Sequence, residues 1–316
     1  MMIAVFPGQG SQSPGFLSPW LELDGAREAM GRYSDWAGVD LVAAGTEWDA
    51  ERIRDTQVAQ PLIVAASLLS WNALAGRDGI DGFAGHSVGE FAAAAASGIL
   101  SEQDALTLVG LRGRAMAEAA AAEQTGMSAI IGGDQDAVVD ALSALDLTPA
   151  NYNGGGQLVA AGALPALAKL AAEPPAGTRV IPLQVAGAFH TRYMTPAVAA
   201  LRDAAGSVSV QDPQRTVWTN RDGSVVDSGA RYLDLLVDQV ASPVRWDLCM
   251  QSFAAADVTG IVEFSPAGTL TGLAKRALRG TPTVAVKTPD DLAAATALLR
   301  SVEAADAAAA TTGDDA

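Results

Sequence analysis

Short apolar segments alternate with longer helical ones along the chain, and this alternation limits the possible folds more than any other feature. The chain opens with an uninterrupted apolar run over residues 2–6, which is typical of a buried strand. A second short and partly apolar run covers residues 81–84. Each run leads into a glycine-containing loop and then into helical sequence. Strands that alternate with helices in this way predict an α/β fold.

Length and composition are consistent with a large globular core. The chain has 316 residues, which favours two domains or one large domain with an insertion, and 49% of its residues are hydrophobic. The net charge of −16 argues against binding to nucleic acid. Cys249 is the only cysteine, so no intramolecular disulfide is possible. Because the sequence has no signal peptide and no apolar run long enough for a membrane, we expect a cytoplasmic protein with no membrane association.

Residues 126–189 contain a more compact alternation of strands and helices. The expected segments are a strand at 127–131, a helix at 134–145, one broken or two separate strands within 148–161, a helix at 164–172 and a strand at 178–185. This order predicts a ferredoxin-like insert at 126–189, within a core formed by 1–125 and 190–302. Residues 303–316 contain four acids and no base and show no apolar period, which predicts a disordered acidic tail.

Two helices are expected on either side of the second strand. The first is predicted to open at Gln60-Pro61 and to run to about Trp71, because proline suits the first turn of a helix. The second is predicted to begin at Ser101, with Asp104 in a capping-box-like position, and to continue to about Ala122.

The motif Gly85-His86-Ser87-Val88-Gly89 lies between the second strand and a helix expected over residues 90–97. A G-x-S-x-G pattern can place a serine on a tight strand-to-helix turn with its hydroxyl exposed. The start of the helix adds backbone N–H groups and positive partial charge where an oxyanion would develop. Glycine-rich turns are common, so the motif alone makes Ser87 a candidate nucleophile without naming a reaction.

A serine nucleophile needs a base, and the chain has only two histidines. His86 is adjacent to Ser87, and neighbouring side chains on a tight turn diverge, so we expect it to pack or to form a hydrogen bond. His190 lies where the insert rejoins the core, and it is therefore the candidate base. No carboxylate stands out as the group that orients His190, and a backbone carbonyl can take that role.

An arginine interrupts the apolar face of the helix that begins at Ser101. Arg112 shares one stripe with Val109 and Met116 at helical spacing. A buried guanidinium requires an anionic partner, because burying an unpaired charge is costly. That partner is either an internal carboxylate in a salt bridge or the carboxylate of a substrate held by a bidentate fork. Spacing alone leaves both interpretations open.

Together these residues resemble malonyl-CoA:acyl carrier protein transacylase, the stand-alone acyltransferase of type II fatty acid synthesis, and are similar to the acyltransferase domains of polyketide synthases. The resemblance rests on four segments that agree in order and spacing and covers nearly the whole chain. These segments are Pro7-Gly8-Gln9-Gly10-Ser11-Gln12, Gly85-His86-Ser87-Val88-Gly89-Glu90, Arg112-Gly113 and Gly187-Ala188-Phe189-His190-Thr191. The resemblance implies an α/β-hydrolase-like core with a ferredoxin-like insert.

The resemblance also implies a ping-pong mechanism that uses a Ser-His dyad. His190 takes the proton of Ser87, which attacks the thioester of malonyl-CoA, and the phosphopantetheine thiol of acyl carrier protein then accepts the malonyl group. The backbone N–H groups that hold the oxyanion map to Gln9 and Val88. The backbone carbonyl that orients the histidine maps to Gln239.

Further residues of the substrate site follow from the same resemblance. Arg112 maps to the residue that grips the malonyl carboxylate. Phe189 resembles the malonyl-selective form of the family, because a bulky ring leaves little space for an α-methyl group. Asn153 matches a segment that lines the cleft on the insert side, and Met116 accompanies Arg112 in the expected substrate-binding set.

A basic island at 275–279, Lys-Arg-Ala-Leu-Arg, stands out in this acidic chain. It either steers an acidic acyl carrier protein or complements the dipole at the end of a helix. We expect a transient complex with acyl carrier protein, malonyl-CoA as the acyl donor, no permanently bound cofactor, no metal and a monomeric enzyme.

Other activities stay open at this stage. A serine thioesterase or esterase would use water as the acceptor, and the combination of Arg112 with the dyad argues against it. A carrier-protein-binding module without activity is disfavoured because nucleophile, base and arginine are all present. If the chain is a transferase, the carrier protein can belong to fatty acid or to polyketide synthesis.

Overall fold

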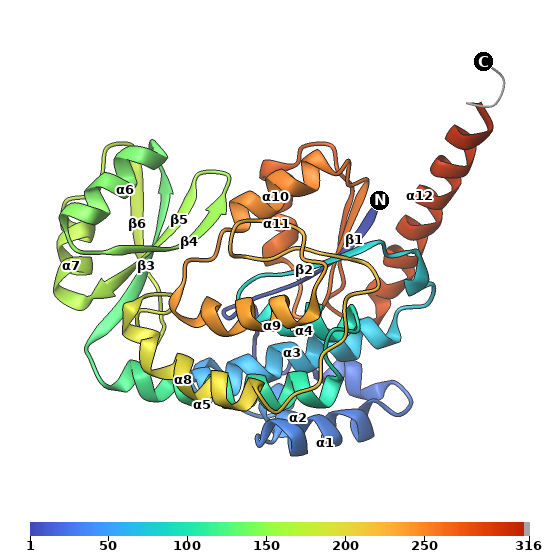
Figure 1. Cartoon of the computed structure of the whole chain (residues 1–316), viewed down its shortest axis with the longest axis horizontal. Helices are drawn as coiled ribbons and strands as arrows, with labels where there is room; N and C mark the ends of the chain where they lie inside the picture. The colour runs from blue at the N-terminus through green and yellow to red at the C-terminus, as the bar shows by residue number, and fades with distance from the viewer. Residues whose placement is uncertain (313–316) are drawn as a thin grey trace.

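The computed structural model describes residues 1–312 and shows an α/β protein with two separate sheets (Figure 1). The larger sheet is parallel, with its strands in the order β7-β2-β1-β8-β9. These strands are β1 (Met2–Phe6), β2 (Gly82–Gly85), β7 (Thr216–Val217), β8 (Gly260–Glu263) and β9 (Thr283–Ala285). The strands predicted at 2–6 and 81–84 are thus confirmed, the second one displaced by one residue.

Helices cover both faces of the parallel sheet. On one face lie α3 (Thr56–Ala73), α4 (Gly89–Ala96) and α5 (Glu102–Ala121), with α1 (Ala26–Ala37), α2 (Leu41–Thr46), α8 (Thr195–Ala205) and α9 (Gly229–Asp238) around them. The other face carries α10 (Trp246–Ala255) and α11 (Thr269–Ala277). Because alternate residues of β1 enter two different hydrophobic clusters, every position of this strand is apolar.

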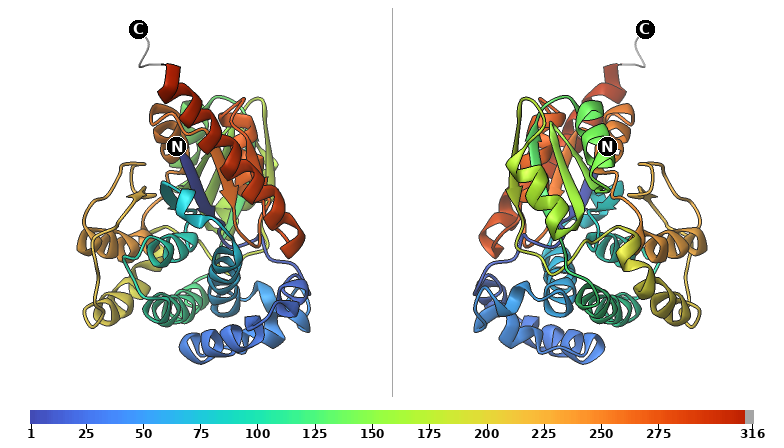
Figure 2. Two further views of the ribbon diagram at one scale, coloured as in Figure 1. Left: turned by 90° about the vertical axis from the view of Figure 1, so that its right-hand side faces the viewer. Right: turned by 90° about the vertical axis from the view of Figure 1, so that its left-hand side faces the viewer.

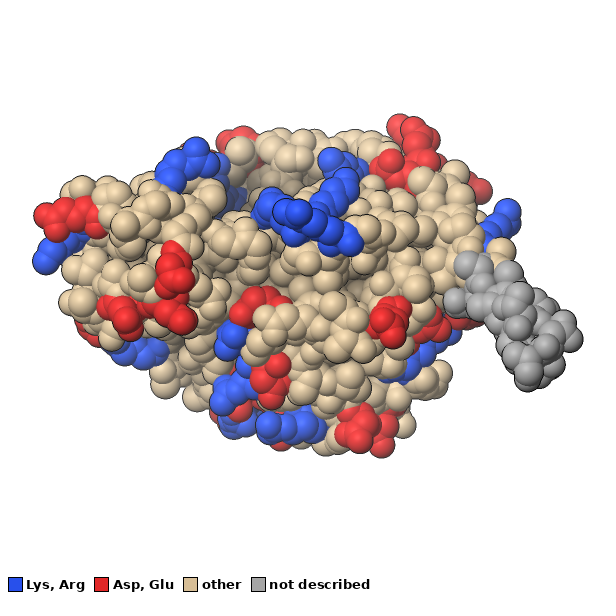
Figure 3. Space-filling view, turned by 90° about the horizontal axis from the view of Figure 1, so that it is seen from above, with Lys and Arg blue, Asp and Glu red and all other residues tan. Residues whose placement is uncertain are grey.

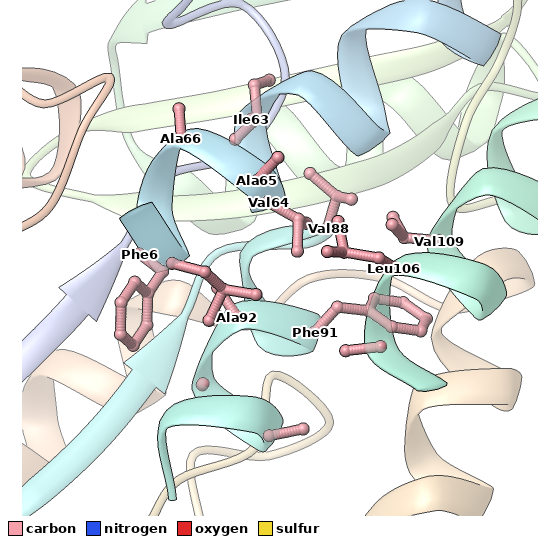
Figure 4. Close-up of a cluster of buried hydrophobic side chains, with 14 of the residues drawn as sticks. Phe6, Ile63, Val64, Ala65, Ala66, Val88, Phe91, Ala92, Leu106 and Val109 are labelled. Carbon is pink, nitrogen blue, oxygen red and sulfur yellow. The ribbon is translucent and has the colours of Figure 1, made fainter. Parts of the chain in front are cut away.

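The cluster behind the predicted nucleophile turn joins β1 to three helices. Figure 4 shows Phe6 on one side of the cluster and Val109 of α5 on the other, with Ala92 of α4 and Val64 of α3 between them. All four side chains are fully buried. The turn that carries Ser87 therefore rests on a packed apolar base, which limits its movement.

The smaller sheet is antiparallel, with its strands in the order β4-β5-β3-β6. Its elements run β3 (Thr125–Gly132), α6 (Gln135–Ala144), β4 (Thr148–Gly154), β5 (Gln157–Ala163), α7 (Leu164–Ala172) and β6 (Thr178–Pro182). Residues 148–161 thus form two strands, and the last residue of β4 and both residues of the turn between the strands are glycines with positive φ. The N–H of Tyr152 donates to the carbonyl of Val244 at 2.9 Å, which ties β4 to the larger part of the molecule.

The helix predicted to open at Gln60-Pro61 begins earlier, at Thr56, so the predicted start is wrong. The side chain of Asp55 caps it by accepting from the N–H of Gln57 at 3.0 Å. Pro61 therefore lies inside α3. Packing of α3 along α5 outweighs the hydrogen bond that the proline removes.

The last helix, α12 (Leu292–Thr312), runs beside β8 and β9 and extends beyond the body of the molecule (Figure 2). Residues 303–312, which the composition predicts to be a disordered tail, belong to this helix because alanine, the strongest helix former, dominates them. Residues 313–316 of the predicted tail lie outside the described residues. Within residues 1–312, no helix is long and apolar enough to cross a membrane.

Candidate active site

A cleft of about 400 Å³ lies between the two sheets and brings most of the predicted site residues together. The loops that follow β1 and β2 form one wall, at the carboxyl ends of these parallel strands. Strands β3, β4 and β5 contribute to the opposite wall. Carboxyl ends of parallel strands are the usual place for a binding site in an open α/β sheet.

The turn that carries Ser87 has a backbone shape that few residues adopt. Ser87 has a φ of 52°, in the left-handed region. A Cβ on Gly85 would lie 2.0 Å from the carbonyl carbon of Gly89, and a Cβ on Gly89 would lie 2.2 Å from the carbonyl oxygen of Phe6. Both glycines are therefore required for the close approach of β2, the turn and α4, and this approach exposes the hydroxyl of Ser87 to the cleft.

Ser87 and His190 form a hydrogen-bonded pair. The Oγ of Ser87 lies 2.7 Å from the Nε2 of His190, and the Nδ1 of His190 lies 2.8 Å from the backbone carbonyl of Gln239. A carbonyl only accepts hydrogen bonds, so the proton of the imidazole is on Nδ1. Nε2 is then free to accept the proton of the Ser87 hydroxyl.

The surroundings keep His190 neutral. Burial lowers the pKa of its imidazole to about 3, and the nearby positive charge of Arg112 adds to this shift. At neutral pH the ring therefore carries no proton on Nε2 and is ready to act as a base. Like Ser87, His190 has a positive φ, of 60°, so both members of the pair are held in strained backbone conformations.

Arg112 lines the same cleft and is bonded to amides only. Its Nη1 donates to the side chain of Gln60 at 2.6 Å and its Nη2 to the side chain of Gln239 at 3.0 Å. Among the residues with described side chains, none forms an ion pair with it, and its Nε has no hydrogen-bond partner. Burial lowers the pKa of Arg112 to about 10, so the guanidinium stays charged at neutral pH. The buried carboxyl group of Glu90 also interacts electrostatically with Arg112, but among the described side chains no carboxylate lies within salt-bridge distance of the guanidinium.

The other predicted residues also border the cleft, except one. Gln9, Val88, Met116 and Phe189 line it, and Phe189 lies directly before His190 in the chain. Asn153 lines it as well, and its Oδ1 lies 2.9 Å from the Nε2 of His86. Gln239 lies behind the cleft, and its carbonyl meets His190 as the resemblance implied.

The sequence profile of the acyl transferase domain family matches residues 3–310. The chain belongs to this family.

Curated relatives and solved structures agree with this assignment over most of the chain. A malonyl CoA-acyl carrier protein transacylase from Mycobacterium tuberculosis is 52% identical over 296 residues, covering 92% of this chain and 98% of the relative. Its counterpart from Escherichia coli is 32% identical, covering 92% and 97%. A crystal structure of the transacylase from Mycobacterium tuberculosis superposes with a TM-score of 0.90 at 53% identity, covering 92% and 98%.

A further solved relative contains a partner protein. It is a malonyl-transacylase in complex with a type II polyketide acyl-carrier protein, and it matches this acyl transferase with a TM-score of 0.85 at 30% identity. The match covers 92% of this chain and 97% of the relative.

Three polar residues at the site of this acyl transferase were not predicted to take part. Gln60 bonds to Arg112, Asn220 accepts from the backbone N–H of Ser87, and Glu90 accepts from the side chain of Gln239. Glu90 had a signal in the sequence, because it is the single charge in the otherwise apolar helix that follows the motif. Gln60 and Asn220 are distant from the motifs in sequence and had none.

Proposed function

We propose that this acyl transferase moves the malonyl group from malonyl-CoA to the phosphopantetheine thiol of acyl carrier protein through a malonyl-Ser87 intermediate. The observation that carries the proposal is the position of Arg112, a buried cation with no salt bridge to any described side chain, in the cleft that contains the Ser87–His190 pair. The names of the relatives supply the donor and the acceptor.

In the first half-reaction, Nε2 of His190 takes the proton of the Ser87 hydroxyl while Oγ attacks the thioester carbonyl of malonyl-CoA. The tetrahedral intermediate collapses, the carbon–sulfur bond breaks, and the CoA thiolate takes the proton back from His190. In the second half-reaction, His190 takes the proton of the carrier-protein thiol, whose sulfur attacks malonyl-Ser87. Ser87 leaves as its alkoxide and recovers that proton, so the enzyme returns to its starting state.

The oxyanion of both tetrahedral intermediates is held by the backbone N–H groups of Gln9 and Val88. Val88 is the N-cap of α4, and no side chain caps this end of the helix. The N–H groups of the next three residues donate to the carbonyls of His86, Ser87 and Val88, so Val88, which lines the cleft, is the residue at this end whose N–H we assign to the oxyanion. The side chain of Gln9 donates to Thr56 at 3.3 Å, which helps to fix the loop after β1. These contacts support electrostatic stabilisation of the transition state.

The substrate side of the cleft fits a small acyl group with a free carboxylate. Arg112 binds the malonyl carboxylate with the N–H groups that Gln60 and Gln239 leave free. Phe189 is only 6% exposed and closes the cleft beside His190, where it disfavours an α-methyl substituent. Met116 and Asn153 complete the lining.

We also assign the two sheets to an α/β-hydrolase-like core at 1–125 and 190–302 and a ferredoxin-like insert at 126–189. The strand–helix–strand–strand–helix–strand order of the antiparallel sheet supports the insert. The solved complex of a relative supports acyl carrier protein as the partner. A monomer that works in the cytoplasm without a bound cofactor stays our expectation.

The proposal is tested by incubating the enzyme with malonyl-CoA, with and without acyl carrier protein. We expect mass spectrometry to find a malonyl adduct on Ser87, none on Ser87→Ala, and malonyl-carrier protein as the product. Free malonate as the sole product would identify a thioesterase instead. An adduct that persists on Ser87→Ala would refute the nucleophile.

Arg112→Ala tests the carboxylate site. We expect the malonyl kcat/KM to fall by about 10²–10³-fold and the acetyl value by about tenfold or less, because only malonyl offers a carboxylate to this cation. The matched control is Arg114→Ala, since Arg114 is on the same helix and donates to the carbonyl of Ala37 at 3.0 Å. Equal losses for malonyl and acetyl in Arg112→Ala would show that the arginine is structural.

A further inference from the structure

A buried carboxyl group that the mechanism does not use lies beneath the active site. Glu90 is the second residue of α4 and is 1% exposed. Its Oε1 accepts from the backbone N–H of Asn220 at 2.7 Å, and its Oε2 accepts from the side-chain amide of Gln239. Burial raises the pKa of Glu90 to about 8, and the hydrogen bonds from Asn220 and Gln239 offset part of the cost of burying this acid.

Through its hydrogen bond with Asn220, Glu90 is connected to the turn that carries Ser87. The Oδ1 of Asn220 accepts from the backbone N–H of Ser87 at 2.7 Å, and its Nδ2 donates to the carbonyl of Gly85 at 2.7 Å. Asn220 thus spans the strained turn from both sides. A strained backbone persists only where its surroundings hold it firmly, and Glu90 fixes the residue that does so.

Through its hydrogen bond with Gln239, Glu90 is also connected to His190 and Arg112. The side-chain Oε1 of Gln239 accepts from Arg112 at 3.0 Å, its Nε2 also donates to the carbonyl of Ser87 at 3.0 Å, and its backbone carbonyl accepts from His190. A guanidinium only donates, so the amide oxygen must face Arg112 and the amide nitrogen must face Glu90. This orientation requires an acceptor at position 90.

We propose that Glu90 is a positioning residue that holds the Ser87–His190 pair and the Arg112 guanidinium in one fixed arrangement, through Asn220 and Gln239. The inference rests on the proposed function for its substrate. It predicts that Glu90 controls both the reactivity of Ser87 and the preference of the enzyme for malonyl over acetyl groups, although Glu90 touches neither the acyl group nor the thiol.

Glu90→Gln is the direct test, because it keeps the size of the side chain. An amide has one acceptor and one donor group, so its NH2 would face either the N–H of Asn220 or the NH2 of Gln239. We expect malonyl-CoA kcat/KM to fall by about 10²-fold, the malonyl-to-acetyl ratio to fall by about tenfold or more, and labelling of Ser87 by a fluorophosphonate to slow by about tenfold or more.

Glu263→Gln is the matched control. Glu263 is fully buried, and its two oxygens accept from the backbone N–H groups of Leu270 and Thr271 at 2.9 and 2.8 Å. This variant suffers the same loss of one acceptor, so we expect comparable destabilisation in urea with an unchanged malonyl-to-acetyl ratio. If Glu90→Gln loses stability to the same extent and keeps the wild-type ratio and labelling rate, Glu90 is merely structural and the inference is overturned.

Gln239→Met keeps the test decisive even if Glu90→Gln does not fold. Methionine retains the backbone carbonyl for His190 and fills a similar volume, but it cuts the connection from Glu90 to Arg112. We expect the malonyl-to-acetyl ratio to fall by about tenfold while fluorophosphonate labelling changes less. An unchanged ratio refutes the role of this connection. Labelling needs no malonyl substrate, so its result for Glu90→Gln stands even if the proposed function fails.

Discussion

At the scale of single residues, burial keeps His190, the proposed base, in the neutral form that can accept a proton. An exposed histidine is partly protonated near neutral pH, and the protonated form cannot accept a proton from a serine. His190 is 4% exposed, and the positive charge of Arg112 lies nearby. Both effects disfavour the imidazolium, and the carbonyl of Gln239 fixes the proton on the remote nitrogen.

The pH dependence of acylation follows from this shift. The pH profile of kcat/KM reports the pKa of the base in the free enzyme. Since the pKa of His190 is lowered to about 3, we expect kcat/KM for malonyl-CoA to change by about twofold or less between pH 7 and pH 5. A base with an ordinary histidine pKa would lose about 30-fold over the same range. Initial rates in a constant-ionic-strength buffer series provide the measurement.

Unfolding must be monitored at each pH, because the same shift affects stability. The folded pKa of His190 lies below the unfolded value of about 6.5, so its contribution to the free energy of unfolding falls as the pH drops below that value, by about 1.4 kcal/mol per pH unit.

Arg112→Gln, measured with acetyl-CoA, is the internal comparison for the pH profile of kcat/KM. This variant removes the positive charge that lowers the pKa of His190. The pH below which kcat/KM falls should therefore move toward neutral. If kcat/KM of the wild-type enzyme instead begins to fall near pH 6.5, the lowered pKa of His190 is contradicted.

The residues that could be predicted from the sequence were those whose chemistry is rare in this chain. Ser87 was marked by its glycines, His190 by the scarcity of histidines and Arg112 by its place in an apolar stripe. Gln60 and Asn220 could not be found in this way, because uncharged amides occur throughout a sequence and acquire their role only from tertiary contacts.

At the scale of elements, the junction of β2 and α4 determines where the nucleophile lies. The helix begins within a few ångströms of the loop after β1, and only glycine at position 89 permits this approach. The sequence predicted the turn well because its signal is local. It predicted the start of α3 poorly, because the cap at Asp55 and the packing against α5 outweigh the local preference of Pro61.

Gly89→Ala should therefore damage both stability and acylation. The added methyl group would lie 2.2 Å from the carbonyl oxygen of Phe6, so β1 and α4 must move apart. We expect a loss of about 1–3 kcal/mol in the free energy of unfolding and a fall of about tenfold or more in the acylation rate of Ser87. Urea unfolding and stopped-flow acylation measure the two effects.

Gly272→Ala is the comparison for this prediction. Gly272 lies within α11, and a Cβ there would meet nothing within 4 Å. Alanine is favoured over glycine in a helix, so we expect this variant to be more stable by about 0.5–1 kcal/mol and fully active. Similar behaviour of the two variants would show that the crowding at Gly89 is not what positions the turn.

At the scale of the whole molecule, an acidic enzyme must receive a carrier protein that, as the family resemblance implies, is acidic too. The net charge of −16 opposes the encounter, and a local concentration of positive charge can offset it. Figure 3 shows Lys and Arg side chains gathered in the middle of the face seen from above, where α10 and α11 lie in Figure 1. Lys275 and Arg276 lie in the last turn of α11 and Arg279 follows the helix, and Arg276 also lines the cleft.

If this basic island steers the carrier protein, its effect must depend on salt and on the acceptor. We expect kcat/KM for acyl carrier protein to fall by about tenfold or more between 0.05 and 0.5 M NaCl, because screening shortens the range of the attraction. With the uncharged acceptor pantetheine the change should be about twofold or less. Lys275→Ala combined with Arg279→Ala should lower the carrier-protein value about fivefold at low salt, whereas Arg300→Ala, on α12, should leave it unchanged. If the double variant instead loses stability and keeps its salt dependence, the island serves only to complement the dipole of α11.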